Sequence, residues 1–145
     1  MTINDTSDGV RVISREFPGT PDQVAQLRRM LRRHLTDAHP SLDDAELLST
    51  ETATNAIKHT KSGRGGSFTV TLWHTPTWLR VNIRDDGGET MPRVAPTPPL
   101  AEHGRGFHII DSLATRWGFV REGSQTEVWF ELDSSGRSPG ETHSG

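Results

Sequence analysis

A helical pattern runs through the stretch Glu51-Thr52-Ala53-Thr54-Asn55-Ala56-Ile57-Lys58-His59. The stretch continues a segment that opens at Ser41-Leu42-Asp43-Asp44, whose acidic first turn suits the positive end of a helix dipole. We expect this helix to end near Gly63. Its buried stripe is predicted to comprise Leu42, Ala45, Leu48, Thr52, Ala56 and Ile57.

Glu51 and Asn55 lie one turn apart on this helix and point the same way, so both can reach a single pocket at its surface. Asn55 can offer a neutral oxygen to Mg²⁺, and Glu51 can accept a proton from a hydroxyl or a water that attacks a terminal phosphate. Lys58 and His59 add basic groups suited to phosphate. For this segment alone, an exposed polar face without a function is an equal alternative.

Two glycine-containing segments follow in a fixed order. Asp85-Asp86-Gly87-Gly88 ends a predicted strand, where an acid can accept a hydrogen bond from an exocyclic amine such as that of adenine, although such a segment is more often only a turn. Gly104-Arg105-Gly106-Phe107 opens an apolar stretch and presents free N–H groups at a helix start. A plain glycine-rich helix start is the alternative, but the charge of Arg105 favours an anion site.

The remaining pattern predicts alternating strands and two further helices. Thr20-Pro21-Asp22-Gln23 has the spacing of a capping box and should begin a helix that runs to about His39, with Val24, Leu27, Leu31 and Leu35 buried. The Pro- and Thr-rich residues 88–103 have the length of a lid or binding loop. Strands are expected at 10–17, 68–72, 79–83, 117–120 and 128–132, with a turn at Thr75-Pro76-Thr77 and a third helix at 106–114.

Length and composition indicate one soluble domain. The 145 residues can bury about two thirds of the surface of the unfolded chain. We expect a flexible N-terminus at residues 1–9, a folded domain at 10–132 and a disordered tail at 133–145. The absence of cysteine excludes disulfides and thiolate metal sites. No apolar run approaches the roughly 20 residues that span a bilayer, and the opening residues lack signal-peptide character, so we expect a cytoplasmic location.

A basic cluster stands on the first predicted helix, at Arg28, Arg29, Arg32 and Arg33. The formal net charge of -3 gives no general attraction to nucleic acid, so we favour a solvated helix face and expect no direct nucleic-acid partner. The same arginines could instead engage an acidic face of a protein partner. They could also engage a second copy of this chain, which leaves a homodimer open.

The ordered segments resemble the motifs of the ATPase superfamily shared by gyrase, heat-shock chaperones, histidine kinases and mismatch-repair proteins. They are most similar to its small stand-alone branch, the anti-sigma factor serine kinases of bacteria. The Glu-x-x-x-Asn-Ala-x-Lys-His run resembles the N-box of that branch, Asp85-Asp86-Gly87 its first glycine box and Gly104-Arg105-Gly106-Phe107 its second. The similarity extends through Trp117-Gly118-Phe119 and residues 128–132, and so covers nearly everything between Val10 and Leu132.

The resemblance implies a Bergerat-type α/β sandwich, in which helices cover one face of a mixed, mostly antiparallel sheet and ATP with Mg²⁺ lies between the helices and a lid. It implies that Glu51 is the general base, Asn55 the Mg²⁺ ligand, Asp85 the adenine contact and residues 104–107 the phosphate loop. A hydroxyl contact behind the adenine is assigned to Thr126. The implied partners are a serine- or threonine-bearing anti-sigma antagonist and a sigma factor.

The sequence departs from the family pattern in two places. Glu89 stands where the second glycine of the Asp-x-Gly-x-Gly box would fall, and Gln125-Thr126-Glu127 stands where the family tends to carry Gly-Lys-Thr. Neither departure touches Glu51 or Asn55. Two hypotheses therefore remain: a kinase that phosphorylates a partner protein, and a non-catalytic module that binds ATP while it holds a partner.

Overall fold

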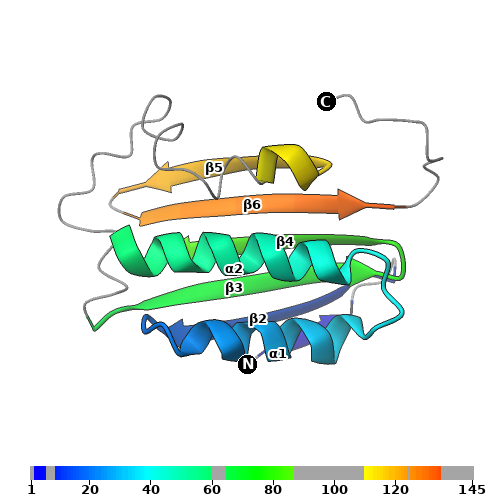
Figure 1. Ribbon diagram of the computed structural model, residues 1–145, viewed down its shortest axis with the longest axis horizontal. Helices are drawn as coiled ribbons and strands as arrows, with labels where there is room; N and C mark the ends of the chain where they lie inside the picture. The colour runs from blue at the N-terminus through cyan, green and yellow to red at the C-terminus, as the bar shows by residue number, and fades with distance from the viewer. Residues whose placement is uncertain (1, 6–8, 60–64, 87–109, 124, 135–145) are drawn as a thin grey trace.

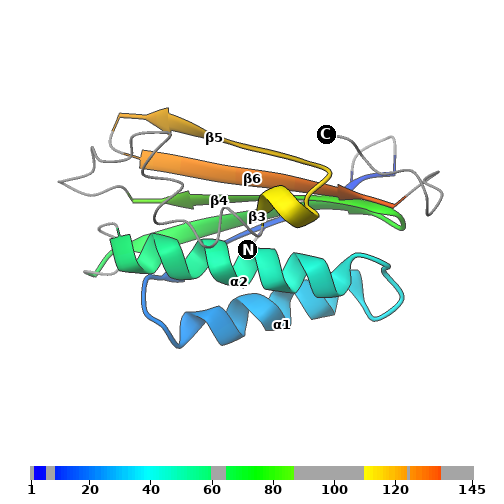
Figure 2. The same cartoon turned by 45° about the horizontal axis from the view of Figure 1, so that its top comes forward.

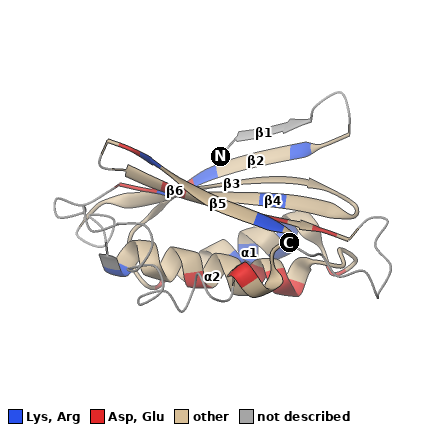
Figure 3. Cartoon of the chain, turned by 90° about the horizontal axis from the view of Figure 1, so that it is seen from above, with Lys and Arg blue, Asp and Glu red and all other residues tan. Residues whose placement is uncertain are grey.

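The computed structural model describes residues 2–5, 9–59, 65–86, 110–123 and 125–134. Its described part has two layers: a six-stranded sheet with the strand order β1-β2-β3-β4-β6-β5, and two helices that lie together on one face of that sheet (Figures 1 and 3). Every pairing between these strands is antiparallel. The predicted α/β sandwich with a mostly antiparallel sheet is confirmed.

From β2 onward, the helices and strands follow the predicted order. Their bounds are β1 (Thr2–Asp5), β2 (Arg11–Pro18), α1 (Gln23–Leu35), α2 (Leu42–His59), β3 (Ser67–Thr75), β4 (Trp78–Asp85), β5 (Arg116–Glu122) and β6 (Gln125–Asp133). Residues 110–113 form one helical turn, which is the described end of the helix predicted at 106–114. The predicted loop at 88–103 and most of the tail at 133–145 lie outside the described residues.

The core forms where the helices meet the sheet, because the strands alternate apolar and polar side chains. Phe68, Val70 and Leu72 of β3 pair with Asp85, Ile83 and Val81 of β4, in that order. All six side chains are buried on the face of the sheet that the helices cover. Phe17 of β2 stacks on Phe68 with 5.3 Å between ring centroids. The hairpin predicted around Thr75-Pro76-Thr77 is confirmed.

Helix α2 packs on β3 and β4 through a stripe of mostly small side chains. The predicted members Leu42, Ala45, Leu48, Thr52 and Ala56 are all buried, and Ile57 packs partly buried against the core. Ser49 and Ala53 are also buried on this stripe, which the sequence analysis did not include. Small residues let the helix lie close to the sheet. Neither helix that the structure describes is long and apolar enough to cross a bilayer.

Helix α1 departs from its prediction at both ends. It begins at Gln23, and its N-cap residue Asp22 makes no side-chain capping bond, so the predicted capping box is wrong; instead the backbone N–H of Gln23 donates to the Thr20 carbonyl at 2.9 Å. It ends at Leu35 and not near His39, because Thr36 leaves the helix with a φ of 63°. Met30 is buried, whereas Val24 is only partly so.

The N-terminal segment also differs from its prediction. Residues 1–9 were expected to be flexible, but Thr2–Asp5 form β1, which pairs antiparallel with β2. Strand β2 would otherwise be the edge of the sheet, with a row of unpaired backbone N–H and C=O groups. The added strand pairs with residues 11–14 of β2 and so covers the first half of that edge.

Three histidines gather where α1, the α1–α2 connection and β3 meet. His39 is buried; its Nδ1 accepts from the Ser41 backbone N–H at 3.1 Å, so its Nε2 donates to the Thr75 carbonyl at 2.9 Å. Burial lowers the pKa of His34, with further contributions from the charges of Arg33 and Arg11. Burial also lowers the pKa of His74, helped by His39, His34 and Arg11. His34 and His74 therefore favour the uncharged form.

Stability should therefore fall as the solution is acidified. In the unfolded chain His34 and His74 bind protons as the pH drops through about 6.5, whereas in the folded protein they resist protonation to lower pH. The stability that the uncharged His34 and His74 contribute is present above a pH of about 6.5 and is lost as the pH falls below it. Urea unfolding between pH 7.5 and pH 5.5 should show this slope, and it should be shallower in the variant His34→Gln/His74→Gln. An identical slope in that variant would contradict the assignment.

Candidate functional site

Three elements that carry predicted site residues end or begin at the same end of the molecule. In Figure 1 the last turns of α2, the end of β4 and the start of β6 all lie at the left. Strands β4 and β6 are neighbours in the sheet, and α2 packs against β4. The fold therefore brings these parts of the sequence into one region.

Glu51 and Asn55 lie on the flank of α2 that faces away from α1. The α1 side of the helix is marked by Glu46, which forms an ion pair with Arg32. At about 100° per residue, Glu51 is turned by about 140° and Asn55 by about 180° from Glu46. Both side chains are partly exposed. They therefore border the side on which the turn at 110–113 and β6 lie (Figure 2).

Asp85 is buried at the last position of β4, with 8% of its surface exposed. It alternates with Val81 and Ile83, and so it faces the helix layer as they do. Its Oδ1 accepts a hydrogen bond from the backbone N–H of Thr126 on β6 at 3.2 Å. The structure thus joins Asp85 to Thr126, two predicted site residues that are far apart in the sequence, and this bond orients the carboxylate.

Asp86 was not singled out from the sequence, but it fixes the turn that follows β4. Its Oδ2 accepts from the backbone N–H of Ser67 at 2.6 Å, and the Ser67 hydroxyl donates to Glu16 on β2 at 2.6 Å. The first residue after β4 is therefore tied to the start of β3. Only the pairing register reveals this role, because the sequence Asp-Asp-Gly-Gly is equally consistent with two solvated acids.

The other predicted site residues divide into those that are described and those that are not. Lys58 is exposed near the end of α2, two turns after Glu51. His59 is the last residue of α2, and its side chain lies outside the described part. Also outside the described residues are Gly87, Gly104, Arg105, Gly106 and Phe107.

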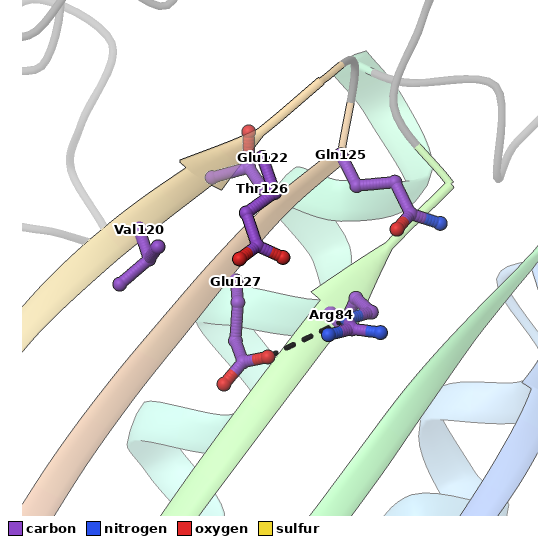
Figure 4. Close-up of a pocket in the computed structure, with 6 residues that line it drawn as sticks. All are labelled: Arg84, Val120, Glu122, Gln125, Thr126 and Glu127. Carbon is purple, nitrogen blue, oxygen red and sulfur yellow. Dashed lines mark ion pairs between the residues drawn. The ribbon is translucent and has the colours of Figure 1, made fainter.

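A hollow of about 120 Å³ lies on the other face of the sheet, at the β5–β6 hairpin (Figure 4). Its lining is Arg84, Val120, Glu122, Gln125, Thr126 and Glu127. Arg84 precedes Asp85 on β4 and points to the opposite face. Because pockets for small organic ligands usually measure about 300 Å³ or more, this hollow is too small for a nucleotide. Its lining includes Thr126 but not Glu51, Asn55 or Asp85.

The donor groups of the region fit a magnesium nucleotide better than a transition metal. As metal ligands, the side chains of Glu51, Asn55 and Asp85 can offer only oxygen atoms, which Mg²⁺ prefers. Among the described residues, no three His, Asp or Glu side chains gather into a closed metal site. An ion held by Asn55 would therefore need most of its ligands from water and phosphate, as is usual for Mg²⁺.

The Asp86 contact predicts a difference between two substitutions. Asp86→Ala removes the acceptor of the partly buried Ser67 N–H and should cost about 1–3 kcal/mol of unfolding free energy. Asp86→Asn keeps a carbonyl oxygen at the same place and should cost distinctly less. Denaturant unfolding of both variants checks this; equal losses would argue against the contact.

The comparison with protein families places these features in context. The model of the histidine kinase-like ATPase domain, HATPase_c_2, matches residues 17–132, which is most of the chain and includes α2, β4 and all of β6 except its last residue. Domains of this kind in general bind ATP with Mg²⁺. A comparison with curated proteins found no significant match. The chain belongs to the family of histidine kinase-like ATPase domains.

Proposed function

We propose that this protein is an ATP-dependent regulator that phosphorylates a serine or threonine of an anti-sigma antagonist, sequesters a sigma factor, or does both. One observation carries the proposal. The acid and amide in the second half of α2 and the oriented carboxylate of Asp85 border the same side of the sheet, in a chain of the ATPase family.

The adenine end of the nucleotide is assigned to Asp85 and Thr126. A carboxylate that accepts from the Thr126 N–H is held in one orientation, and an oriented acceptor suits the exocyclic amine of adenine. The burial of Asp85 strengthens such a bond, because water competes less for the carboxylate. The Thr126 side chain shares the face of Val128, which is the helix side of β6, and so it can add a hydroxyl contact.

The phosphate end is assigned to the last two turns of α2. Asn55 supplies an oxygen for Mg²⁺, and Lys58, one turn further along, supplies a positive charge for phosphate. When bound, Mg²⁺ would offset the negative charge of the phosphate oxygens. The predicted phosphate loop at residues 104–107 completes this assignment as a prediction from the sequence.

Glu51 is assigned the role of general base. It is partly exposed, so its carboxylate can take the proton from a serine or threonine hydroxyl of a partner as the hydroxyl oxygen bonds to the terminal phosphorus of ATP. The bond between that phosphorus and the bridging oxygen breaks, and ADP leaves. A base at this position needs access to a second protein, which a fully buried carboxylate would not have.

The second candidate is a module that binds ATP and a partner without transferring phosphate. Glu89 in place of a glycine and the Gln125-Thr126-Glu127 segment favour it, because both alter the surroundings of the nucleotide relative to the family pattern. Measured nucleotide binding without turnover would support this module. Rapid phosphorylation of a partner would exclude it.

Calorimetric titration with ATP tests the assignment of the nucleotide site. Asp85→Asn keeps an acceptor for the Thr126 N–H but reverses part of the polarity toward the adenine amine, so ATP affinity should fall about 10- to 100-fold while the unfolding temperature stays close to wild type. Asn55→Ala should weaken binding only when Mg²⁺ is present. The control Asp44→Asn makes the same charge change at an exposed position of α2 and should leave affinity unchanged.

Transfer of labelled phosphate tests the kinase hypothesis. Wild-type protein, incubated with labelled ATP and proteins captured from the native cell, should phosphorylate a serine or threonine on one of them. Glu51→Gln should lower the rate about 10²- to 10⁴-fold while ATP affinity is preserved. Transfer that does not depend on Glu51 would refute its role, and absence of transfer with intact binding would favour the second candidate.

A further inference from the structure

An apolar side chain stands on the exposed side of α2, next to Glu51. Among the described residues, three large hydrophobic side chains are exposed: Leu47 at 43%, Leu113 at 37% and Val120 at 49%. Leu47 lies one helical turn before Glu51. Leu113 belongs to the turn at 110–113, on the flank of α2 that carries Glu51 (Figure 2). Two of the three exposed apolar side chains therefore border the candidate site.

Leu47 points away from the sheet. At about 100° per residue, the buried stripe of α2 is centred about 80° to one side of Glu46, whereas Leu47 lies about 100° to the other side. Glu51 follows at only about 40° from Leu47, so the two side chains are neighbours on the helix surface. In Figure 1, α2 lies in front of the sheet, and no described element lies in front of α2. This surface is therefore accessible to a second protein.

Leu47 belongs to a row of four residues spaced by four positions, namely Asp43, Leu47, Glu51 and Asn55. All four are exposed or partly exposed. With a rise of about 1.5 Å per residue, neighbours in the row are separated by about 6 Å along the helix axis. In an extended segment, alternate side chains point the same way and repeat about every 6.6 Å. An extended segment along α2 can therefore place one side chain over each member of the row.

The chemistry of the row changes along its length. Asn55 and Glu51 are the assigned Mg²⁺ ligand and general base, so the reacting phosphate and hydroxyl meet at that end. Leu47 offers an apolar contact about 6 Å from Glu51 along the axis, which corresponds to two residues of an extended segment. Asp43 offers a negative charge about 12 Å from Glu51, which corresponds to four residues.

The surroundings of Asp43 carry a net negative charge. Asp44 is exposed beside Asp43, whereas Glu46 forms an ion pair with Arg32. Partial burial first, and then the charge of Asp43, raise the pKa of Asp44. The second effect is repulsion between two carboxylates. A cationic side chain of a partner would complement the charge at this end of the row.

We propose that the row Asp43, Leu47, Glu51 and Asn55, here called the acceptor ridge, binds the partner segment that carries the acceptor hydroxyl. The segment is extended, and its serine or threonine lies at Glu51. An apolar side chain two residues away packs on Leu47, and an arginine or lysine four residues away, on the same side, pairs with Asp43. This assignment rests on the proposed kinase function, because the role of Glu51 fixes the place of the hydroxyl. Leu47 and Asp43 determine specificity and do not touch the reacting atoms.

Fluorescence anisotropy with labelled peptides tests the acceptor ridge without requiring phosphate transfer. The probe is a short peptide with arginine, leucine and alanine at alternate positions, the alanine replacing the acceptor serine, and small polar residues elsewhere. A second probe has the reversed sequence, because both chain directions give the same spacing. One of the two should bind in the presence of ATP and Mg²⁺. Replacing its leucine by serine should weaken binding about 3- to 10-fold, and replacing its arginine by glutamate about 2- to 5-fold at low salt.

Exchange of charge on the protein gives a test that a merely structural role would not pass. Asp43→Lys should reverse the preference, so that the glutamate probe binds better than the arginine probe. Leu47→Ala should weaken binding of the leucine probe about 3- to 10-fold but should hardly affect the probe that lacks leucine. The matched controls Glu122→Lys and Val120→Ala alter exposed side chains of β5, on the opposite face of the sheet, and should leave both preferences unchanged. Circular dichroism and ATP affinity should match wild type in all four variants.

Transfer of phosphate to the serine form of the probe separates this proposal from the proposed function. If transfer occurs, Leu47→Ala should raise KM about 3- to 10-fold and leave kcat nearly unchanged. Probe binding that follows both exchanges, without transfer, would support the acceptor ridge and count against the kinase function. Absence of binding by both probes, or preferences that survive Leu47→Ala and Asp43→Lys, would overturn the acceptor ridge, even if the protein phosphorylates another substrate.

Discussion

The packing of α2 on β3 and β4 is the constraint on which the rest of the molecule depends. The buried stripe of α2 is made largely of small side chains, including Ala45, Ser49, Ala53 and Ala56, so the helix can lie close to the sheet. That stripe also fixes the rotation of the helix about its axis. With the stripe buried and Glu46 held by Arg32, only one flank remains for Glu51 and Asn55, and it is the flank toward β6.

Consecutive side chains of β4 point to opposite faces of the sheet. Asp85 is buried on the helix side and contacts Thr126, whereas Arg84 is on the open side and pairs with Glu127. The same division holds on β6, where Thr126 and Glu127 are also consecutive. A shift of one residue in the register of β4 against β6 would move Asp85 and Arg84 each to the opposite face, away from Thr126 and Glu127. The contacts on both faces therefore specify the same pairing.

Much of the fold could be predicted from the sequence because its signals are local. Strands β3 and β4 show strict alternation, and α2 shows a helical stripe that ends in the motif Glu51 to His59, so type and order were predicted correctly. The ends of α1 could not be predicted: the Thr20–Gln23 segment has capping-box spacing, but the backbone turn at Thr20 is used instead of the side chain. Strand β1 was missed because its place depends on the unpaired edge of β2, which is a tertiary feature.

The candidate site likewise has one part that could be predicted from local sequence and another that depends on tertiary structure. The type and spacing of Glu51 and Asn55 indicated one shared surface, and the helix places them on one flank. The contact of Asp85 with Thr126 and that of Asp86 with Ser67 depend on which strands are neighbours, and no single segment contains that information. The crossover in the sheet order, which puts β6 and not β5 beside β4, creates the Asp85 contact.

The same strand order determines which charged residues are neighbours on the sheet face opposite the helices. Arg80 stands on β4 and Arg116 on β5, and these two strands lie on either side of β6. With β6 between them, Glu131 lies between Arg80 and Arg116 and pairs with both. The position of β6 between β4 and β5 therefore has two effects. On the helix side it orients the buried Asp85, and on the other face it places Glu131 between two arginines.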